Sequence, residues 1–164
     1  MPYAFGSRSL QRLEGIHPDL RRVMDRAIAT TNIDFTVLEG MRTLSRQKKL
    51  VASGASKTMN SRHLTGHAVD IAPLVGGKVS WDWPLYHRLA PIVKQAALDE
   101  GVKIEWGGDW RSFKDGPHWQ LPWRDYPAGY CRRSLRRLSF YALVRFGCSV
   151  LSRCGMWRYV WKSS

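Results

Sequence analysis

Two short segments of the 164-residue chain hold most of the side chains whose types and spacing could support catalysis. The first contains His63 and Asp70, and the second contains Asp115 and His118. Zinc takes imidazole nitrogen and carboxylate oxygen as ligands, and a catalytic zinc keeps three protein ligands and one open position for water. His63, Asp70 and His118 would form such a set if the fold brought them together. The residue types and their spacing therefore permit a catalytic zinc site but do not by themselves establish one.

Asp115 supplies the further group that a hydrolytic zinc site needs. It precedes His118 by three residues, with Gly116 and Pro117 between them. A turn at these two residues would place the carboxylate beside the activated water, which is where a general base must lie. The chain contains neither an HExxH nor a CxxC sequence, the patterns with the most diagnostic mechanics. The spacing alone therefore leaves open that each histidine is a surface residue or is hydrogen-bonded within its loop.

The two segments together resemble a family of zinc peptidases. The residues that carry the resemblance are Ser-Arg-His-x-x-Gly-x-Ala-x-Asp at 61–70 and Asp-x-x-His-Trp at 115–119. The family comprises D-alanyl-D-alanine carboxypeptidases and L-alanyl-D-glutamate endopeptidases, and the closest likeness is to phage endolysins of the L-alanyl-D-glutamate peptidase type. Further similar stretches are residues 13–20, 39–43 and 106–118. The resemblance covers about residues 5–125 and does not include the C-terminal tail.

This resemblance implies a role for each residue of the pattern. His63, Asp70 and His118 would hold Zn²⁺. Asp115 would be the general base and then the acid that protonates the leaving amine. Arg42 would face the substrate, where it would either bind a carboxylate or stabilise the developing oxyanion, and Ser61 would contact the substrate.

Other assignments remain open from the residue types alone. Without the resemblance, Arg42 after a strand reads as a solvated surface residue, and Ser61 is as well suited to capping a loop. His67 is predicted to be a structural or supporting group and not a ligand. Tryptophan is large and apolar, so core packing is its more common role. The three tryptophans that could instead line a substrate groove are Trp106, Trp110 and Trp119.

The elements that must position these residues follow from hydrophobic spacing and from turn residues. Helical spacing alternates along the chain with short strand-like runs, so we predict an α+β fold. Its small, mostly antiparallel sheet would be flanked by helices and would carry the zinc site. Pro91 lies inside the last helical pattern and predicts a kink or a break there. The predicted helices are 18–28, 43–51 and 84–98, and the predicted strands are 34–39, 68–73, 102–106 and 118–121.

The charge of the chain is concentrated at its C-terminal end. Residues 127–164 hold eight Arg and Lys and no acidic residue, whereas the formal charge of the whole chain is +13. We therefore predict a peptidase domain at 1–126 and a basic, aromatic tail at 127–164. Basic residues with Trp and Leu at helical spacing are typical of segments that bind an anionic lipid surface or lipopolysaccharide. The alternatives are a tail that packs on the domain, and a disordered tail attracted only by bulk electrostatics.

The functional prediction is a zinc endopeptidase that cuts the L-Ala–D-Glu bond of the peptidoglycan stem peptide. A D-Ala-D-Ala carboxypeptidase with the same zinc chemistry is the nearest alternative, and a non-catalytic zinc-containing wall-binding module is another. No nucleic-acid motif appears, so the basic charge does not indicate a nucleic-acid partner. The N-terminus lacks a signal peptide. We therefore expect a monomer made in the host cytoplasm that reaches the wall in the periplasm once the inner membrane is breached.

Overall fold

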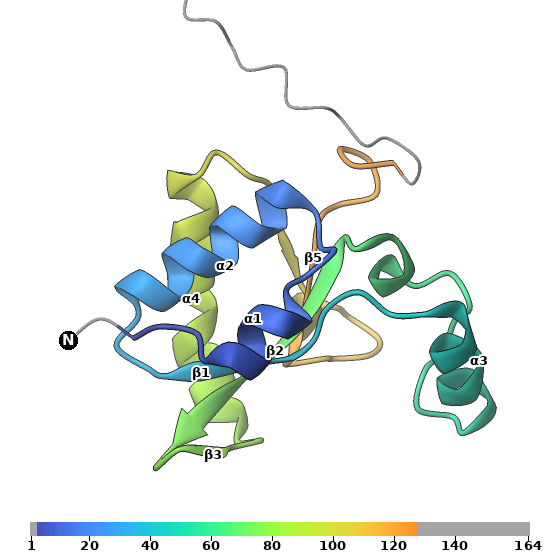
Figure 1. The fold of residues 1–164 in the computed structure, drawn as a ribbon, viewed down its shortest axis with the longest axis horizontal. Helices are drawn as coiled ribbons and strands as arrows, with labels where there is room; N and C mark the ends of the chain where they lie inside the picture. The colour runs from blue at the N-terminus through green and yellow to red at the C-terminus, as the bar shows by residue number, and fades with distance from the viewer. Residues whose placement is uncertain (1–2, 128–164) are drawn as a thin grey trace, which may run out of the picture. The chain divides into compact units, whose positions relative to one another are not determined.

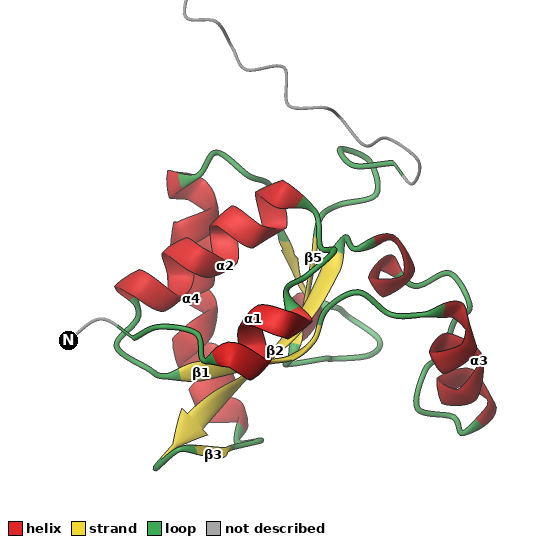
Figure 2. Ribbon diagram, in the orientation of Figure 1, coloured by secondary structure: helices red, strands yellow, loops and turns green. Residues whose placement is uncertain are grey.

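The computed structural model describes residues 3–127, so the predicted tail, apart from Pro127, lies outside the described residues. Helices and strands are interleaved along the described residues, and every strand pairing among them is antiparallel. The predicted α+β class with a small antiparallel sheet is therefore confirmed (Figure 2). Among the described residues, no helix has the length and apolar character needed to cross a membrane.

The sheet has the strand order β1-β2-β5-β4, and β3 pairs with β2. β2 lies between β1 and β5, so Asp70 on β2 faces Glu39 on one side and His118 on the other. The β1–β2 register shifts between Val37 and Glu39, which is the signature of a bulge. The strands are β1 Phe35–Glu39, β2 Ala68–Val75, β3 Lys78–Val79, β4 Glu105–Trp106 and β5 His118–Gln120.

Figure 1 shows α2 and α4 packed side by side, whereas α3 lies apart from this pair. Two short 3₁₀ turns, η1 and η2, precede or follow strands of the sheet. The helical elements are α1 Ser7–Arg12, α2 Pro18–Thr30, α3 Leu44–Ala52, η1 Arg62–Thr65, α4 Trp83–Asp99 and η2 Gly107–Asp109. The predicted helices at 18–28 and 43–51 are therefore confirmed within a few residues.

The sequence of α2 explains why it forms and what it packs against. Pro18 occupies the first turn, where its missing N–H costs nothing, and the His17 imidazole Nδ1 accepts the Asp19 N–H at 3.2 Å. One face of the helix is fully buried, and each such aliphatic side chain contributes roughly 1.5–3 kcal/mol relative to exposure. The buried residues of this face are Leu20, Val23, Met24, Ala27 and Ile28.

α4 runs unbroken from Trp83 to Asp99 with Pro91 inside it. The sequence predicted a kink or a break at Pro91, and the structure shows no break there. Pro91 is exposed, so its ring lies on the outer face of the helix and not in the core. Leu89 and Val93, on either side of the proline, are buried in the core. Packing of this apolar face outweighs the one missing hydrogen bond.

Two strand predictions differ from the structure by more than one residue at an end. The predicted strand at 102–106 is reduced to the two residues of β4, because the Val102 N–H is bonded to the Ala97 carbonyl at the end of α4. β2 continues past Pro73 to Val75, where it pairs with β3. The helix α1 lies outside every predicted element, and it packs against β1.

Candidate active site

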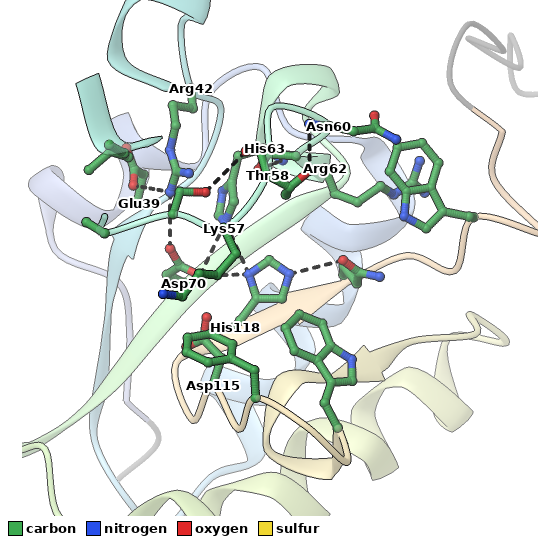
Figure 3. Close-up of a pocket in the computed structure, with 18 residues that line it drawn as sticks. Glu39, Arg42, Lys57, Thr58, Asn60, Arg62, His63, Asp70, Asp115 and His118 are labelled. Carbon is green, nitrogen blue, oxygen red and sulfur yellow. Dashed lines mark hydrogen bonds and ion pairs between the residues drawn. The ribbon is translucent and has the colours of Figure 1, made fainter. Parts of the chain in front are cut away.

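His63, Asp70 and His118 come together from three separate elements, η1, β2 and β5 (Figure 3). One ligand-type atom from each lies within 4.8 Å of the other two. Asp70 and His118 are direct cross-strand partners in the β2–β5 ladder, so the sheet register sets their spacing. The three residues that the sequence predicted as a set are therefore adjacent, and they could hold a metal ion.

The hydrogen bonds of the two imidazoles leave one nitrogen lone pair on each ring facing the same point. His63 Nδ1 lies 2.8 Å from the Gly40 carbonyl oxygen, and His118 Nε2 lies 3.1 Å from Gln120 Oε1. Both oxygens can only accept, so these two nitrogens are assigned as the protonated ones. The remaining nitrogens, His63 Nε2 and His118 Nδ1, are 3.2 Å apart and lie 3.3 and 3.1 Å from Asp70 Oδ1.

This donor set fits a metal cation. Two imidazole lone pairs and a carboxylate oxygen at such distances repel one another unless a positive charge lies among them. Tetrahedral zinc with bonds of about 2.0–2.1 Å places neighbouring ligand atoms about 3.3 Å apart. The separations in this cluster match that value, and His63 and His118 are buried, whereas the Asp70 side chain is 19% exposed.

The Asp70 carboxylate is held in its ionised form. Burial alone raises its pKa, but the adjacent His118 and His63 imidazoles, which favour a negative charge here when they are protonated, outweigh burial and hold the pKa well below its ordinary range. Arg42 adds a positive charge, with its Nη2 lying 3.7 Å from Asp70 Oδ2. An ionised carboxylate is the form that binds a metal.

Asp115 lines the same pocket as the three ligand-type residues. Burial and, next, the negative charge of Asp70 raise the pKa of its carboxyl group. Its backbone N–H donates to the Gly107 carbonyl at 3.0 Å. A Cβ at Gly107 would lie 2.5 Å from the Asp115 carbonyl oxygen, so only glycine permits this approach. The His118 N–H donates to the Asp115 carbonyl at 3.3 Å across Gly116 and Pro117, so the predicted turn is present, and Asp115 lines the pocket.

Arg42 is buried at the pocket wall, which excludes the alternative of a solvated surface residue. Its Nη1 donates to Gln47 Oε1 at 2.7 Å, and its Nη2 donates to Glu39. The Glu39 carboxylate also accepts a hydrogen bond from Arg46. Burial alone would raise the pKa of Glu39, but its hydrogen bonds to the two arginines and their positive charges lower it. The guanidinium group of Arg42 is therefore fixed by side chains on both sides.

The remaining predicted residues divide between the pocket and the core. The Ser61 hydroxyl accepts the His63 N–H at 3.4 Å as a cap, and Ser61 also lines the pocket. His67 lies outside the ligand group and packs against His17, with ring centroids 5.0 Å apart. Of the three tryptophans, Trp110 lines the pocket beside His118, whereas the two others, Trp106 and Trp119, are stacked in the core.

The pocket has a volume of about 370 Å³ and contains groups that the sequence did not single out. Gln120 lines the pocket, and its Nε2 donates a hydrogen bond to Glu105 Oε2 at 2.7 Å. Gln120 follows His118 by two residues on a strand, so alternation alone would have placed both on one face. Glu39 and Lys57 also line the pocket. Glu39 bonds to Arg42 and Arg46, which lie beyond the end of its strand, so strand alternation does not show these contacts.

Comparisons with known proteins agree on one family. A family model described as phage L-alanyl-D-glutamate peptidase matches residues 1–120. An L-alanyl-D-glutamate peptidase of Escherichia phage T5 is 33% identical over 119 residues, which are 70% of this chain and 87% of that protein. The peptidoglycan L-alanyl-D-glutamate endopeptidase CwlK of Bacillus subtilis (strain 168) is 29% identical over 122 residues, 65% of this chain and 73% of that protein.

A solved structure supports the same assignment. The crystal structure of the Serratia marcescens L-Ala D-Glu endopeptidase ChiX superposes with a TM-score of 0.72. It is 49% identical in sequence, and the match covers 76% of this chain and 93% of that one. The similarity therefore extends to sequence and fold together.

Proposed function

The chain belongs to the phage L-alanyl-D-glutamate peptidase family, and we propose that it is a zinc-dependent endopeptidase that hydrolyses the L-Ala–D-Glu bond of the peptidoglycan stem peptide. The single observation that carries the proposal is the convergence of His63, Asp70 and His118 in one pocket with Asp115. A non-catalytic wall-binding module would need neither the Asp115 carboxylate nor a pocket beside the ligands.

Zinc is the metal that we propose, because it prefers imidazole nitrogen and carboxylate oxygen in tetrahedral sites. Held by His63, Asp70 and His118, it would lower the pKa of a water molecule to about 7 and polarise the scissile carbonyl group. The hydrogen bonds to Gly40 and Gln120 would keep both imidazoles in the tautomer that this role needs.

Asp115 is proposed to transfer the proton during hydrolysis. Its carboxylate accepts a proton from the attacking water, whose oxygen bonds to the L-Ala carbonyl carbon. The C–N bond then breaks, and Asp115 returns the proton to the amine of D-Glu. A general base works best when its pKa is close to the working pH, so the raised pKa of this buried carboxyl group suits the role.

Arg42 and Ser61 are proposed to act on the substrate. The Arg42 guanidinium is fixed by Gln47 and Glu39, so it is a preorganised positive charge beside Asp70. Such a fixed group is suited to stabilising an oxyanion, and the loss of one oxyanion donor costs roughly 2.7–4 kcal/mol of transition-state stabilisation. Ser61 is proposed to contact the peptide backbone through its hydroxyl group, in addition to capping the His63 turn.

Mass spectrometry of digested Gram-negative peptidoglycan tests the proposed function. Wild-type protein, EDTA-treated protein and Asp115→Ala would be compared, with Asp99→Ala, an exposed carboxylate on α4, as the matched control. We expect peptides that begin with free D-Glu from wild type and Asp99→Ala only. Loss of terminal D-Ala alone would instead identify a carboxypeptidase. Absence of cleavage by a protein that binds zinc would favour the wall-binding module.

The tail and the route to the wall form a second part of the proposal. Residues 127–164 carry eight basic and no acidic residues and lie beyond the family match, which ends at residue 120. We propose that this segment attracts the enzyme to anionic lipid or lipopolysaccharide after the inner membrane opens, and that the enzyme acts as a monomer. Deleting it should weaken binding to anionic vesicles and leave hydrolysis of isolated wall intact. Equal vesicle binding by the shortened protein would refute this role.

A further inference from the structure

The D-Glu side of the scissile bond presents a charge that the pocket must accommodate. Glutamate has two carboxyl groups, and its amine is acylated by L-Ala in this substrate. Only one carboxyl group can carry the next residue of the stem, so the other is a free carboxylate unless it is amidated. Moving a carboxylate from water into a pocket is unfavourable unless a cation or several hydrogen-bond donors meet it.

Three cationic side chains line the pocket, and two of them are already engaged. Arg42 donates to Gln47 and Glu39. Arg62 is 2% exposed, and its Nε and Nη2 both donate to the Leu121 carbonyl, at 3.1 and 2.7 Å. Its guanidinium face is covered by the Trp123 ring at 4.3 Å. Each guanidinium group keeps one buried nitrogen without a partner among the described residues, Arg42 Nε and Arg62 Nη1, but these contacts hold both groups in place at the pocket wall.

Lys57 is the third cation, and it differs from the arginines. It is exposed and lines the pocket, and among residues 3–127 no carboxylate lies within 4.0 Å of its ammonium group. The segment from 128 to 164 contains no Asp or Glu that could pair with it. Figure 3 shows Lys57 among the side chains around His63 and Asp70.

The loop that carries Lys57 is held to the site by one buried amide. Gln47 is completely buried, and its Nε2 donates to Ser56 Oγ at 2.9 Å and to the Thr58 carbonyl at 2.6 Å. These two partners are the residues on either side of Lys57. The same Gln47 accepts a hydrogen bond from Arg42. The lysine is therefore anchored relative to the arginine, and only its flexible side chain must order on binding.

We propose that Lys57 binds the free carboxylate of the D-Glu residue and makes the enzyme select a glutamate carboxylate over a carboxamide. This inference rests on the proposed function, since it assigns a partner to one group of that substrate. Arg42 and Lys57 would then have different roles. Arg42 remains fixed beside Asp70, and Lys57 recognises the charge of the substrate.

Two synthetic muropeptides that differ only in this group test the proposal, one with the carboxylate and one with a carboxamide. The proteins are wild type, Lys57→Met, Lys57→Arg and the control Lys49→Met, which removes an exposed charge from α3 outside the pocket. A hydrogen bond to a charged group corresponds to a change of about tenfold or more in affinity. We expect Lys57→Met to lose about tenfold in kcat/KM on the carboxylate substrate, mainly through KM. Its activity on the carboxamide should match wild type, and Lys57→Arg should retain the preference.

Three results would overturn the inference. One is an equal loss by Lys57→Met on both substrates, and another is no loss on either. The third is an equal loss by Lys49→Met and Lys57→Met that disappears with added salt, because general attraction would then explain both. Wild type that cleaves neither muropeptide would overturn the proposed function itself, together with this inference. Because Lys57 is exposed, thermal unfolding of each variant should match wild type and exclude misfolding as the cause.

Discussion

Replacing Gln120 by Met should weaken zinc binding without removing any ligand. Gln120 Oε1 accepts the His118 Nε2–H at 3.1 Å, and its Nε2 donates to Glu105 Oε2. Met has a similar length and no amide group, so the change leaves the buried His118 N–H and the Glu105 carboxylate without this partner. The imidazole can then rotate or change tautomer, and either change moves its Nδ1 lone pair away from the site.

The size of the effect follows from the burial of this hydrogen bond. Gln120 and His118 are each 8% exposed, so water has little access to the freed N–H group. A buried donor without a partner costs about 1–3 kcal/mol. Since about 1.4 kcal/mol corresponds to a factor of ten, the zinc dissociation constant should rise roughly 5- to 150-fold. Loss of a partner that orients a metal-bound histidine costs 10- to 100-fold in other sites, which is the same range.

Competition with a chromophoric chelator would measure this dissociation constant directly. Gln95→Met is the matched control, because Gln95 is exposed on α4 and its side chain, among the residues that the structure describes, bonds only to Asp99. At saturating zinc, Gln120→Met should recover most of its peptidase activity, since Asp115 and the ligands remain. An unchanged zinc affinity in Gln120→Met, or an equal loss in the control, would refute the role given to this amide.

Three further predictions concern the base, an ion pair and acid stability. Asp115→Asn should bind zinc as wild type does but lose about 10²–10⁴ in kcat, measured on purified wall. Glu39→Gln removes the nearer of the two carboxylates beside the buried charge of Arg42 and leaves only Asp70, so urea unfolding should show a loss of about 1–3 kcal/mol. Burial and the charge of Arg62 lower the pKa of His67 below its ordinary 6.5. Stability should therefore be full above pH 6.5 and fall as the pH drops below it, because the unfolded chain binds the proton more readily. His67→Asn should flatten this fall in thermal unfolding measured against pH.

The sequence predicted those parts of the fold whose signals are local. The helix α2 shows apolar residues at helical spacing, and the same spacing marks Leu89 and Val93 in α4. The ligand-type residues were predicted because imidazole and carboxylate groups in that order suit one kind of chemistry. His63 and Asp70 lie within one short pattern, and His118 follows a turn that is itself visible in the sequence.

Parts of the structure that depend on distant contacts were missed or predicted with the wrong length. α1 has six residues and buries only Ser9, so no amphipathic spacing marks it. It is held to β1 by long-range bonds, with Ser9 Oγ lying 2.9 Å from Thr36 Oγ1 and Arg12 donating to the Val37 carbonyl. The attachment of the Lys57 loop to Gln47 is shorter in range but equally hidden, since side-chain hydrogen bonds between a helix and a loop leave no periodic signal.

The short pattern around His63 could be recognised because its geometry tolerates few substitutions. Gly66, at the end of η1, has φ +70°, and a Cβ there would lie 2.4 Å from the Gly15 carbonyl oxygen. Its own carbonyl accepts the His17 N–H at 2.7 Å, which ties the ligand-bearing turn to the start of α2. Asp70 then follows on β2, where a slip of one residue would turn its carboxylate to the opposite face of the sheet. Spacing within the pattern thus fixes both the turn and the register. A change in the number of residues between His63 and Asp70 should abolish metal binding even if both side chains remain.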